Sequence, residues 1–172
     1  VRYALGAIKG VGKPAMQSVE EARKAGPFTD LQHFAERIDP RQVNRRCFEA
    51  LAKAGAFHPI EPNRAKAFAA APMLSALAAA AEQDRSSNQE NLFGDQAKQK
   101  TRLPDAAAWG ESERLDHELA SVGFFLSGHP LDDYAPALKR KNLLTLAELQ
   151  EKAERDGAAV ARVGVLVSGL QE

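Results

Sequence analysis

The chain has 172 residues, with 23 Lys and Arg balanced by 23 Asp and Glu, so its formal net charge is zero. No apolar run is long enough to span a bilayer and no signal-peptide pattern is present, so we expect a cytoplasmic protein without a membrane partner. The single cysteine, Cys47, cannot form an internal disulfide; it lies in a helical pattern, which predicts a small buried side chain. Because the chain begins at Val1 and ends in an apolar stretch, we expect a piece of a longer polypeptide.

The zero net charge hides an asymmetry along the chain. Residues 1–80 carry 12 Lys and Arg against 7 Asp and Glu, whereas residues 81–172 carry 11 against 16. The excess of basic residues in residues 1–80 and of acidic residues in 81–172 indicates that only the first part contacts nucleic acid.

A glycine hairpin near the amino end is the feature around which the chain is organised. Gly10 and Gly12 allow a tight turn and the close approach of a partner, because neither carries a Cβ. Pro14 suits the first turn of the helix that follows. The free amides of such a turn, next to two lysines, form an anion site suited to backbone phosphates. The residues predicted to bind there are Lys9, Gly10, Val11, Gly12 and Lys13.

Glycines at this spacing also occur in three different kinds of structure. A helix–helix connection that binds nothing remains open, since Gly-x-Gly occurs in many ordinary turns. A dinucleotide fingerprint is disfavoured, because no strand precedes the glycines and no third glycine follows at the required place. A P-loop is excluded, because Gly12-Lys13 is followed by Pro14 and not by Ser or Thr.

Two helix–turn–helix units are predicted in tandem. The first joins a short helix over residues 2–8 to a second over 15–24, which Gly26-Pro27 ends. In the second unit, a capping box at 29–32 opens a helix reaching Ile38, and Asn44 caps the next helix, which stops at Gly55. Four polar residues gather where this second turn meets its helix, namely Arg41, Asn44, Arg45 and Arg46. Cations at a helix start oppose the macrodipole, which favours a bound phosphate; a merely solvated basic face is the alternative.

A long alanine-rich helix should follow from Asn63 towards Gln83, kinked or split at Pro72. Residues 84–102 then read as an exposed linker, polar throughout except for a Leu-Phe pair. We predict that Gln89, Leu92 and Phe93 bind a pocket of a partner protein, although the pair could instead pin the linker to its own domain.

The remaining segment, residues 103–157, reads as a helical connector. It contains a helix from about Glu111, a short helix over residues 131–141 and a capping box at Thr145 that opens a helix closing at Gly157. Residues 160–168 alternate like a β-strand. No nucleophile–base pair, metal-ligand spacing or paired aspartates are found, so the fragment alone is predicted to have no catalytic residues, metal or cofactor. His129 with Asp132 and Asp133 is better explained by turn and cap roles.

Six motifs in order resemble the alpha subunits of bacterial DNA polymerase III, the C-family replicative polymerases. They are residues 3–12 (YALGAIKGVG), 26–31 (GPFTDL), 43–46 (VNRR), 51–57 (LAKAGAF), 89–94 (QENLFG) and 123–134 (GFFLSGHPLDDY). Each motif is modest alone, whereas the ordered set covers nearly the whole chain.

The resemblance implies a mainly α fold in four parts. These are a tandem helix-hairpin-helix DNA-binding domain (1–83), an exposed linker with a clamp-binding pentapeptide (84–102), a helical connector (103–157) and the first β-strand of a truncated OB-fold (158–172). It also implies sequence-independent binding of primer-template duplex DNA, and binding of the sliding clamp through Gln89, Leu92 and Phe93. The parent protein would be a DNA-directed DNA polymerase that uses Mg²⁺ in its palm domain and assembles with other holoenzyme subunits.

Three hypotheses therefore follow. The first is a duplex-binding and clamp-tethering region of a replicative polymerase. The second is a protein-interaction scaffold whose hairpins only pack and do not contact DNA. The third, a helix-hairpin-helix nuclease or glycosylase, is disfavoured by the missing catalytic constellation.

Overall fold

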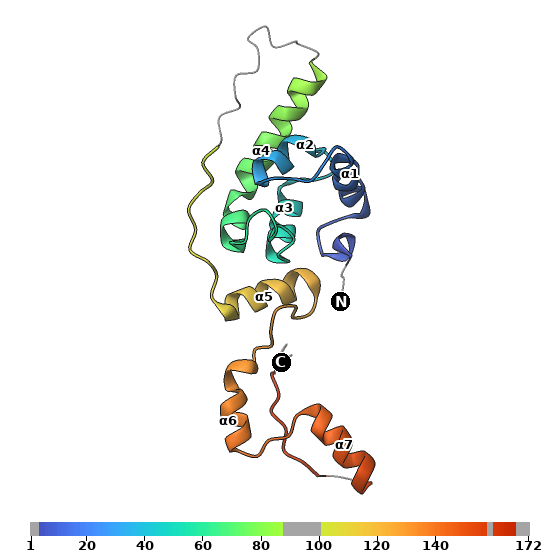
Figure 1. Cartoon of the computed structure of the whole chain (residues 1–172), viewed down its shortest axis with the longest axis vertical. Coiled ribbons are helices and arrows are strands. Elements are labelled where there is room, and N and C mark those ends of the chain that lie inside the picture. The colour runs from blue at the N-terminus through green and yellow to red at the C-terminus, as the bar shows by residue number, and fades with distance from the viewer. Residues whose placement is uncertain (1–3, 88–100, 158–159, 168–172) are drawn as a thin grey trace, which may run out of the picture. The chain divides into compact units, whose positions relative to one another are not determined.

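The computed structural model describes residues 4–87, 101–157 and 160–167. These residues divide into two compact units, Val1–Phe125 and Leu126–Glu172. Helices dominate both units, as predicted (Figure 1). None of the helices in the described ranges is both long and apolar enough to cross a bilayer.

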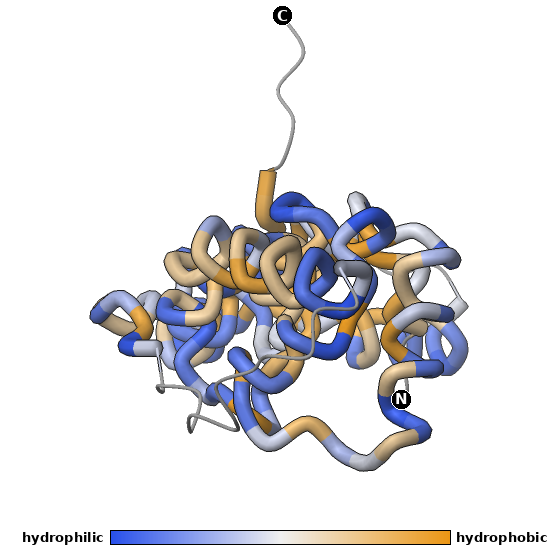
Figure 2. Tube along the Cα trace, turned by 90° about the horizontal axis from the view of Figure 1, so that it is seen from above, coloured by the Kyte–Doolittle hydropathy of each residue, from blue (hydrophilic) through white to orange (hydrophobic). Residues whose placement is uncertain are grey.

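The first unit is built from two helical pairs and a long helix. A 3₁₀ turn, Leu5–Ala7, precedes α1 (Lys13–Lys24), and α2 (Leu31–Arg37) precedes α3 (Arg45–Lys53). The long helix α4 (Arg64–Ser86) packs on α2 and α3, and α5 (Glu111–Val122) packs on α3. Apolar and polar residues interleave along the helices, as the orange and blue segments of Figure 2 show, so each helix can turn an apolar face inward.

Three buried phenylalanines, Phe34, Phe48 and Phe57, lie at the centre of this core, and the partly buried Phe28 packs against them. Phe34 lies edge-on to Phe28, Phe48 and Phe57, with ring centroids 4.9, 5.7 and 5.2 Å apart. Buried alanines of α4, together with Leu74, let that helix approach closely. Cys47 is buried in the same core, which confirms its predicted role as a small apolar side chain. Burial raises the pKa of its thiol to about 11.

Local sequence signals fix most helix starts. Asn44, Asn63 and Thr145 are N-caps whose side chains accept backbone amides, as predicted. The expected cap at Thr29 is wrong by one residue: Asp30 is the N-cap, and its Oδ1 accepts the His33 amide at 2.8 Å. Asp30 rather than Thr29 caps α2 because a carboxylate accepts a stronger, charge-assisted hydrogen bond from the amide than a hydroxyl does.

Two further predictions about helices are corrected. The first helix is a single 3₁₀ turn at Leu5–Ala7 within the described residues, and not a helix over residues 2–8. A split at Pro72 is wrong, because α4 runs unbroken from Arg64 to Ser86, whereas a kink at Pro72 stays a prediction. Pro72 is exposed while Ala71 and Leu74 are buried, so packing on both sides holds the helix together.

Residues 101–110 run back along the first unit in extended form (yellow in Figure 1). The Thr101 amide donates to Gln32 Oε1 at 2.8 Å, and Asn63 Nδ2 donates to the Ala106 carbonyl at 2.9 Å. Trp109 then packs on His117 of α5 with ring centroids 4.1 Å apart. This part of the predicted connector therefore belongs to the same compact unit as the hairpins.

The second unit contains α6 (Ala135–Arg140) after a 3₁₀ turn (Asp132–Tyr134), and α7 (Leu146–Asp156), which opens with the predicted capping box at Thr145 and Glu148. The predicted strand over residues 160–168 is not seen among the described residues 160–167, which form a single parallel bridge between Val163 and Leu144. Val160, Val165 and Val167 are exposed, because one strand finds no sheet to join and cannot persist alone. The OB-fold strand is therefore not supported.

Candidate nucleic-acid interface

The first hairpin connects the 3₁₀ turn to α1 over residues 8–12. Ile8 and Val11 are buried at 3% exposure each, and they anchor both sides of the turn in the core. Between them, Gly10 has a φ of +85°, a left-handed conformation that side-chain-bearing residues rarely adopt. The apolar anchors thus turn the rest of the hairpin towards solvent, where Lys9, Gly10 and Gly12 are exposed.

The amides of this hairpin divide into two sets. The Lys9 amide donates to the Ser121 carbonyl at 2.9 Å and the Val11 amide to the Ile8 carbonyl at 3.0 Å, so both are satisfied inside the protein. Among the residues that the structure describes, the amides of Gly10, Gly12 and Lys13 have no acceptor. Three exposed donors therefore remain at the tip of the turn and the start of α1, where the helix dipole also favours an anion.

Charge around these donors is positive. Lys13 is the first residue of α1, whose first turn contains no acidic residue, and Pro14 lies in that turn as predicted. Within the described ranges, neither Lys9 nor Lys13 forms an ion pair. Two ammonium groups with no carboxylate partner can therefore add to the attraction of the amides for a phosphate.

The second hairpin, over residues 38–44, repeats the buried apolar anchors but not the free turn amides, because the Gln42 and Val43 amides donate to the Asp39 carbonyl at 3.1 and 2.9 Å. Ile38 and Val43 are fully buried, as Ile8 and Val11 are in the first hairpin. The Asn44 side chain accepts the Cys47 amide at 3.1 Å, and α3 has no acidic residue in its first turn. Arg41 and Arg46 are exposed. This matching pattern brings the predicted residues of the second turn to one helix start.

One predicted cation of the second hairpin is partly neutralised. Arg45 Nε lies 2.7 Å from Glu49 Oε1, one helical turn along α3. Asp39 adds a further carboxylate, which accepts the Arg41 amide at 2.9 Å. The second hairpin is therefore the weaker of the two candidate phosphate sites.

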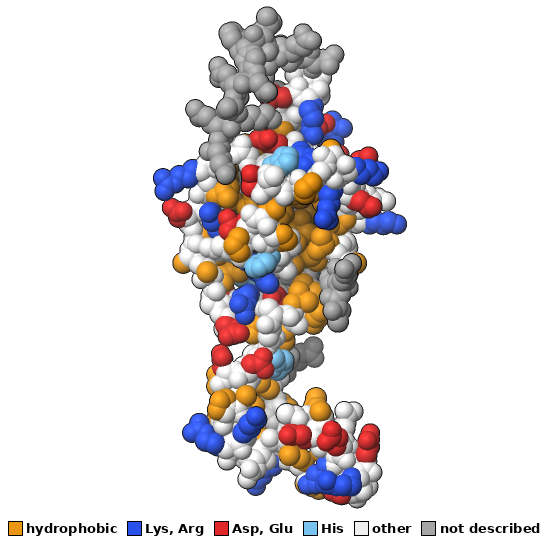
Figure 3. Space-filling view, viewed as in Figure 1, with side chains coloured by type: hydrophobic (Ala, Val, Ile, Leu, Met, Phe, Trp, Pro, Cys, Tyr) orange, Lys and Arg blue, Asp and Glu red, His pale blue; other side chains and the backbone are white. Residues whose placement is uncertain are grey.

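Basic side chains do not form one continuous patch on the face seen in Figure 3, where blue and red side chains are interspersed over the helical unit. Local donors at the hairpins, and not a broad positive field, are thus the basis of the candidate interface. The predicted clamp-binding residues Gln89, Leu92 and Phe93 lie outside the described residues.

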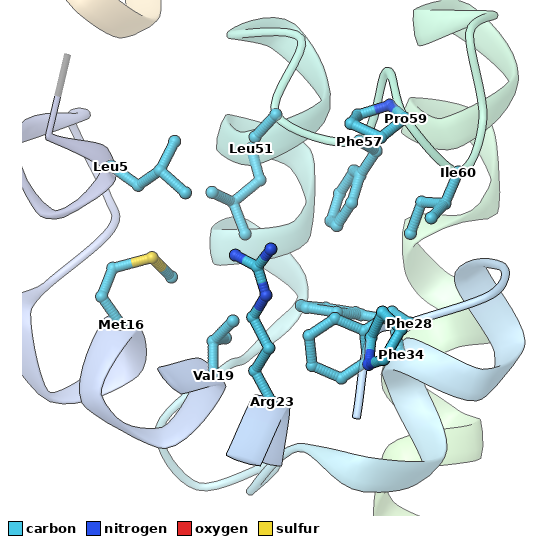
Figure 4. Close-up of a pocket in the computed structure, with 12 residues that line it drawn as sticks. Leu5, Met16, Val19, Arg23, Phe28, Phe34, Leu51, Phe57, Pro59 and Ile60 are labelled. Atoms are coloured by element: carbon cyan, nitrogen blue, oxygen red, sulfur yellow. The ribbon is translucent and has the colours of Figure 1, made fainter. Parts of the chain in front are cut away.

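An apolar pocket separates α1 from the second hairpin unit (Figure 4). Met16 and Val19 of α1 face Phe34, Leu51 and Phe57 across it. Arg23 supplies its one charged side chain, so the pocket has no set of converging polar groups that could carry out a reaction.

Candidate catalytic chemistry is otherwise sparse. Across residues 4–87, 101–157 and 160–167, no three His, Cys, Asp or Glu side chains are grouped to hold a metal ion. His129 and Asp132 form the predicted turn: the His129 amide donates to Asp132 Oδ2 at 2.7 Å, and the Leu131 amide donates to His129 Nδ1 at 3.1 Å.

Sequence reasoning missed the contribution of α5 to the hairpin. Ser121 supplies the acceptor for the Lys9 amide, and Glu118, one turn earlier, is fully buried in an ion pair with Arg64. A signal was present, since Glu118 falls between Leu115 and Val122 on the apolar stripe of α5. A carboxylate in such a stripe indicates a buried ionic partner.

Comparison with known proteins gives a consistent result. A family model described as a helix-hairpin-helix motif matches residues 1–67. That range contains both hairpins described above, with their buried anchors and exposed turns.

Curated relatives extend the match over nearly the whole chain. DNA polymerase III subunit alpha of Caulobacter vibrioides is 45% identical over 168 residues, covering 96% of this chain and 15% of the relative. The Neisseria meningitidis serogroup A protein of the same name is 44% identical over 143 residues, covering 81% and 12%. The Vibrio cholerae protein of that name is 37% identical over 159 residues, covering 88% and 13%. The chain thus spans about a seventh of the length of these relatives.

Proposed function

We propose that this chain, which belongs to the DNA polymerase III alpha-subunit family as one region of it, binds the backbone of duplex DNA and tethers its polymerase to a sliding clamp. The parent protein is a DNA polymerase whose catalytic residues lie in other regions, and it works with the other holoenzyme subunits in the cytoplasm. The relatives carry the name of the whole alpha subunit, and the present chain covers only a small part of their length.

One observation carries the DNA-binding part of the proposal. The exposed amides of Gly10, Gly12 and Lys13 have no acceptor among the described residues, and the side chains of Lys9 and Lys13 lie beside them without ion pairs. Oxygen atoms of a backbone phosphate would satisfy these donors and neutralise the lysines. Because neither amides nor lysines at a turn read base edges, binding should not depend on sequence.

A second contact would come from Arg41, Asn44, Arg45 and Arg46 at the start of α3. The two hairpins are anchored alike, by Ile8 with Val11 and by Ile38 with Val43. The second would contact phosphate through its side chains, because the Arg41, Gln42 and Val43 amides are bonded to Asp39. Binding would also have to displace Glu49 from Arg45, which makes this contact the less favourable one.

Fluorescence anisotropy with a labelled duplex across a salt series tests the proposal. Four cation–phosphate contacts, from Lys9, Lys13, Arg45 and Arg46, predict that the logarithm of the association constant falls with the logarithm of salt at a slope of about −4. Replacing Lys9→Gln with Lys13→Gln should make this slope shallower by about 2. The matched control, Lys24→Gln with Arg102→Gln, removes the same charge from exposed positions elsewhere in the unit and should leave the slope unchanged.

The scaffold hypothesis predicts a different outcome. If the hairpins only pack, the chain will show no salt-dependent affinity for the duplex, while a clamp would still bind. An incision assay on the same duplex separates a third possibility, a nuclease or glycosylase, from both.

A further inference from the structure

The first hairpin is held in place by a helix more than a hundred residues away in the sequence. The Lys9 amide donates to the carbonyl of Ser121 in the last turn of α5, at 2.9 Å. Ser121 is only 4% exposed, so this bond is shielded from water. It fixes the backbone immediately before Gly10, the first of the amides proposed to bind phosphate.

An ion pair that is fully buried at its glutamate and 20% exposed at its arginine connects α5 to the start of α4. Glu118, which is fully buried, lies with its Oε1 atom 2.6 Å from Nη1 of Arg64, the first residue of α4. The same guanidinium nitrogen donates to the Lys53 carbonyl at 3.4 Å, at the end of α3. One arginine thus connects α3, α4 and α5.

The backbone beside this pair leaves space for the guanidinium. Gly55 has a φ of +75°, and a Cβ at this position would lie 2.6 Å from Arg64 Cζ. Any side chain there would have to displace the arginine. The glycine after α3, the arginine at the start of α4 and the glutamate of α5 therefore form one arrangement.

We propose that Arg64 and Glu118 are positioning residues for the first hairpin, acting through the Ser121 carbonyl. Glu118 and Ser121 lie about one turn apart on the buried side of α5. The ion pair of Glu118 therefore fixes where the last turn of α5 lies along the helix axis and how it is rotated about that axis, and with it the Ser121 carbonyl that accepts the Lys9 amide. The hairpin is then assembled from segments on both sides of residues 88–100. A change in the seating of α5 would be transmitted to the amides of Gly10, Gly12 and Lys13.

The DNA readout of this inference rests on the proposed function, but the coupling itself can be measured without DNA. In the full 172-residue chain, Glu118→Ala leaves the guanidinium of Arg64, whose side chain is 20% exposed, without its carboxylate partner in α5, so α5 should shift. We expect amide hydrogen exchange of Lys9, followed by NMR, to accelerate on the order of tenfold. Duplex affinity should fall by about 3- to 10-fold, because the hairpin donors lose their fixed orientation.

Two further variants separate positioning from general stability. Glu113→Ala removes an exposed carboxylate from the same helix and should change neither Lys9 exchange nor duplex affinity. The pair Arg64→Met with Glu118→Met replaces the ion pair by apolar side chains, which buried sites often accept. It should restore both readouts to within about 2-fold of the original chain, because it reseats α5 without the charges.

Each outcome decides the inference. A folded Glu118→Ala chain with unchanged Lys9 exchange overturns it, whatever happens to DNA binding. If circular dichroism shows that Glu118→Ala is unfolded, Glu118→Gln decides: faster Lys9 exchange supports the inference and unchanged exchange overturns it. If the original chain binds no duplex but Glu118→Ala still accelerates hydrogen exchange of the Lys9 amide, the proposed function fails and the positioning role stands.

Discussion

Gly10 and Gly12 stand two residues apart in the same turn, but only the backbone conformation of Gly10 requires glycine. Gly10 has a left-handed φ of +85°, so its backbone conformation alone accounts for the residue. Gly12 has φ −78° and ψ 160°, an ordinary extended conformation that any residue can adopt. A glycine at position 12 leaves the amides at the start of α1 without a neighbouring side chain, which would permit the phosphate contact that we propose there.

Replacing Gly12 with Ser should separate stability from binding. Gly12 is the N-cap of α1 and provides no side-chain hydrogen bond, whereas a serine hydroxyl could accept the Ala15 amide, because Pro14 at the second helical position has no N–H. We expect Gly12→Ser to stabilise folding by about 0.3 kcal/mol in urea denaturation. The same variant should weaken duplex binding, because its side chain would stand beside the Gly12 and Lys13 amides and hinder the close approach of a phosphate.

The test lies in the opposite directions of the two changes: Gly12→Ser should raise the free energy of unfolding and lower the affinity for duplex. A Gly12→Ser chain that binds duplex as tightly as the original would mean that no phosphate closely approaches the Gly12 and Lys13 amides. Gly110→Ser is a suitable control, because Gly110 is likewise an extended N-cap without a side-chain hydrogen bond, at the start of α5.

At the scale of elements, helix starts can be predicted from the sequence and helix contacts cannot. The caps at Asn44, Asn63 and Thr145 are predictable because capping is a local interaction between a side chain and the next turn. The cap at Asp30 is predicted one residue early, since Thr and Asp both suit that position. The strand prediction at residues 160–168 is wrong because alternation describes a half-buried strand only where a second strand exists to pair with it.

The candidate site shows the same division. The glycine turn of the first hairpin, the Asp-Pro turn of the second and their cations are predictable because the residues are neighbours in the sequence. The support of Lys9 by Ser121, and the pairing of Arg64 with Glu118, join residues 112 and 54 positions apart in the sequence. No periodic pattern reports such contacts, although a lone glutamate in the apolar stripe of α5 indicates that a partner exists.

The packing of α5 predicts a dependence of stability on pH. Burial, and secondarily the charge of Lys53, lower the pKa of His117 from its ordinary value of 6.5, while Glu113 and Asp116 act in the opposite direction. A histidine with a lowered pKa takes up its proton more readily in the unfolded chain. Its effect is absent well above pH 6.5 and destabilises the fold as the pH falls through 6.5 towards the folded-state pKa.

Urea denaturation at about pH 8 and about pH 5.5, on either side of the ordinary histidine pKa, measures this effect. The midpoint should fall more on acidification for the original chain than for His117→Phe, which keeps an aromatic ring against Trp109. The control His58→Phe changes an exposed histidine and should retain the full decrease. An equal decrease in the original chain and in His117→Phe would show that the His117 environment does not contribute.

At the scale of the whole molecule, the two proposed activities should be separable. Leu92→Ala with Phe93→Ala should abolish binding to a sliding clamp in surface plasmon resonance, because the two apolar side chains are proposed to fill its pocket. Duplex affinity should remain unchanged, since the hairpins lie in another part of the chain. The control Asn88→Ala with Asp95→Ala alters polar residues of the same segment and should preserve both activities.

Concurrent loss of clamp and duplex binding in the Leu92 and Phe93 variant, with circular dichroism unchanged, would contradict two independent contacts. If the variant with Leu92→Ala and Phe93→Ala still binds the clamp, the proposed clamp contact through these residues is contradicted. The proposed DNA interface of the hairpins is not affected by that result.

The DNA-binding proposal depends on particular backbone amides of the first hairpin binding phosphate. An ¹⁵N-edited NMR titration of the full chain with a short duplex observes each of these amides separately. We predict that the amide resonances of Gly10, Gly12 and Lys13 move most, while that of Val11, whose amide is already bonded to Ile8, moves less. Shifts confined to other regions, or none at Gly10 and Gly12 when the duplex is bound, would contradict phosphate binding by this hairpin.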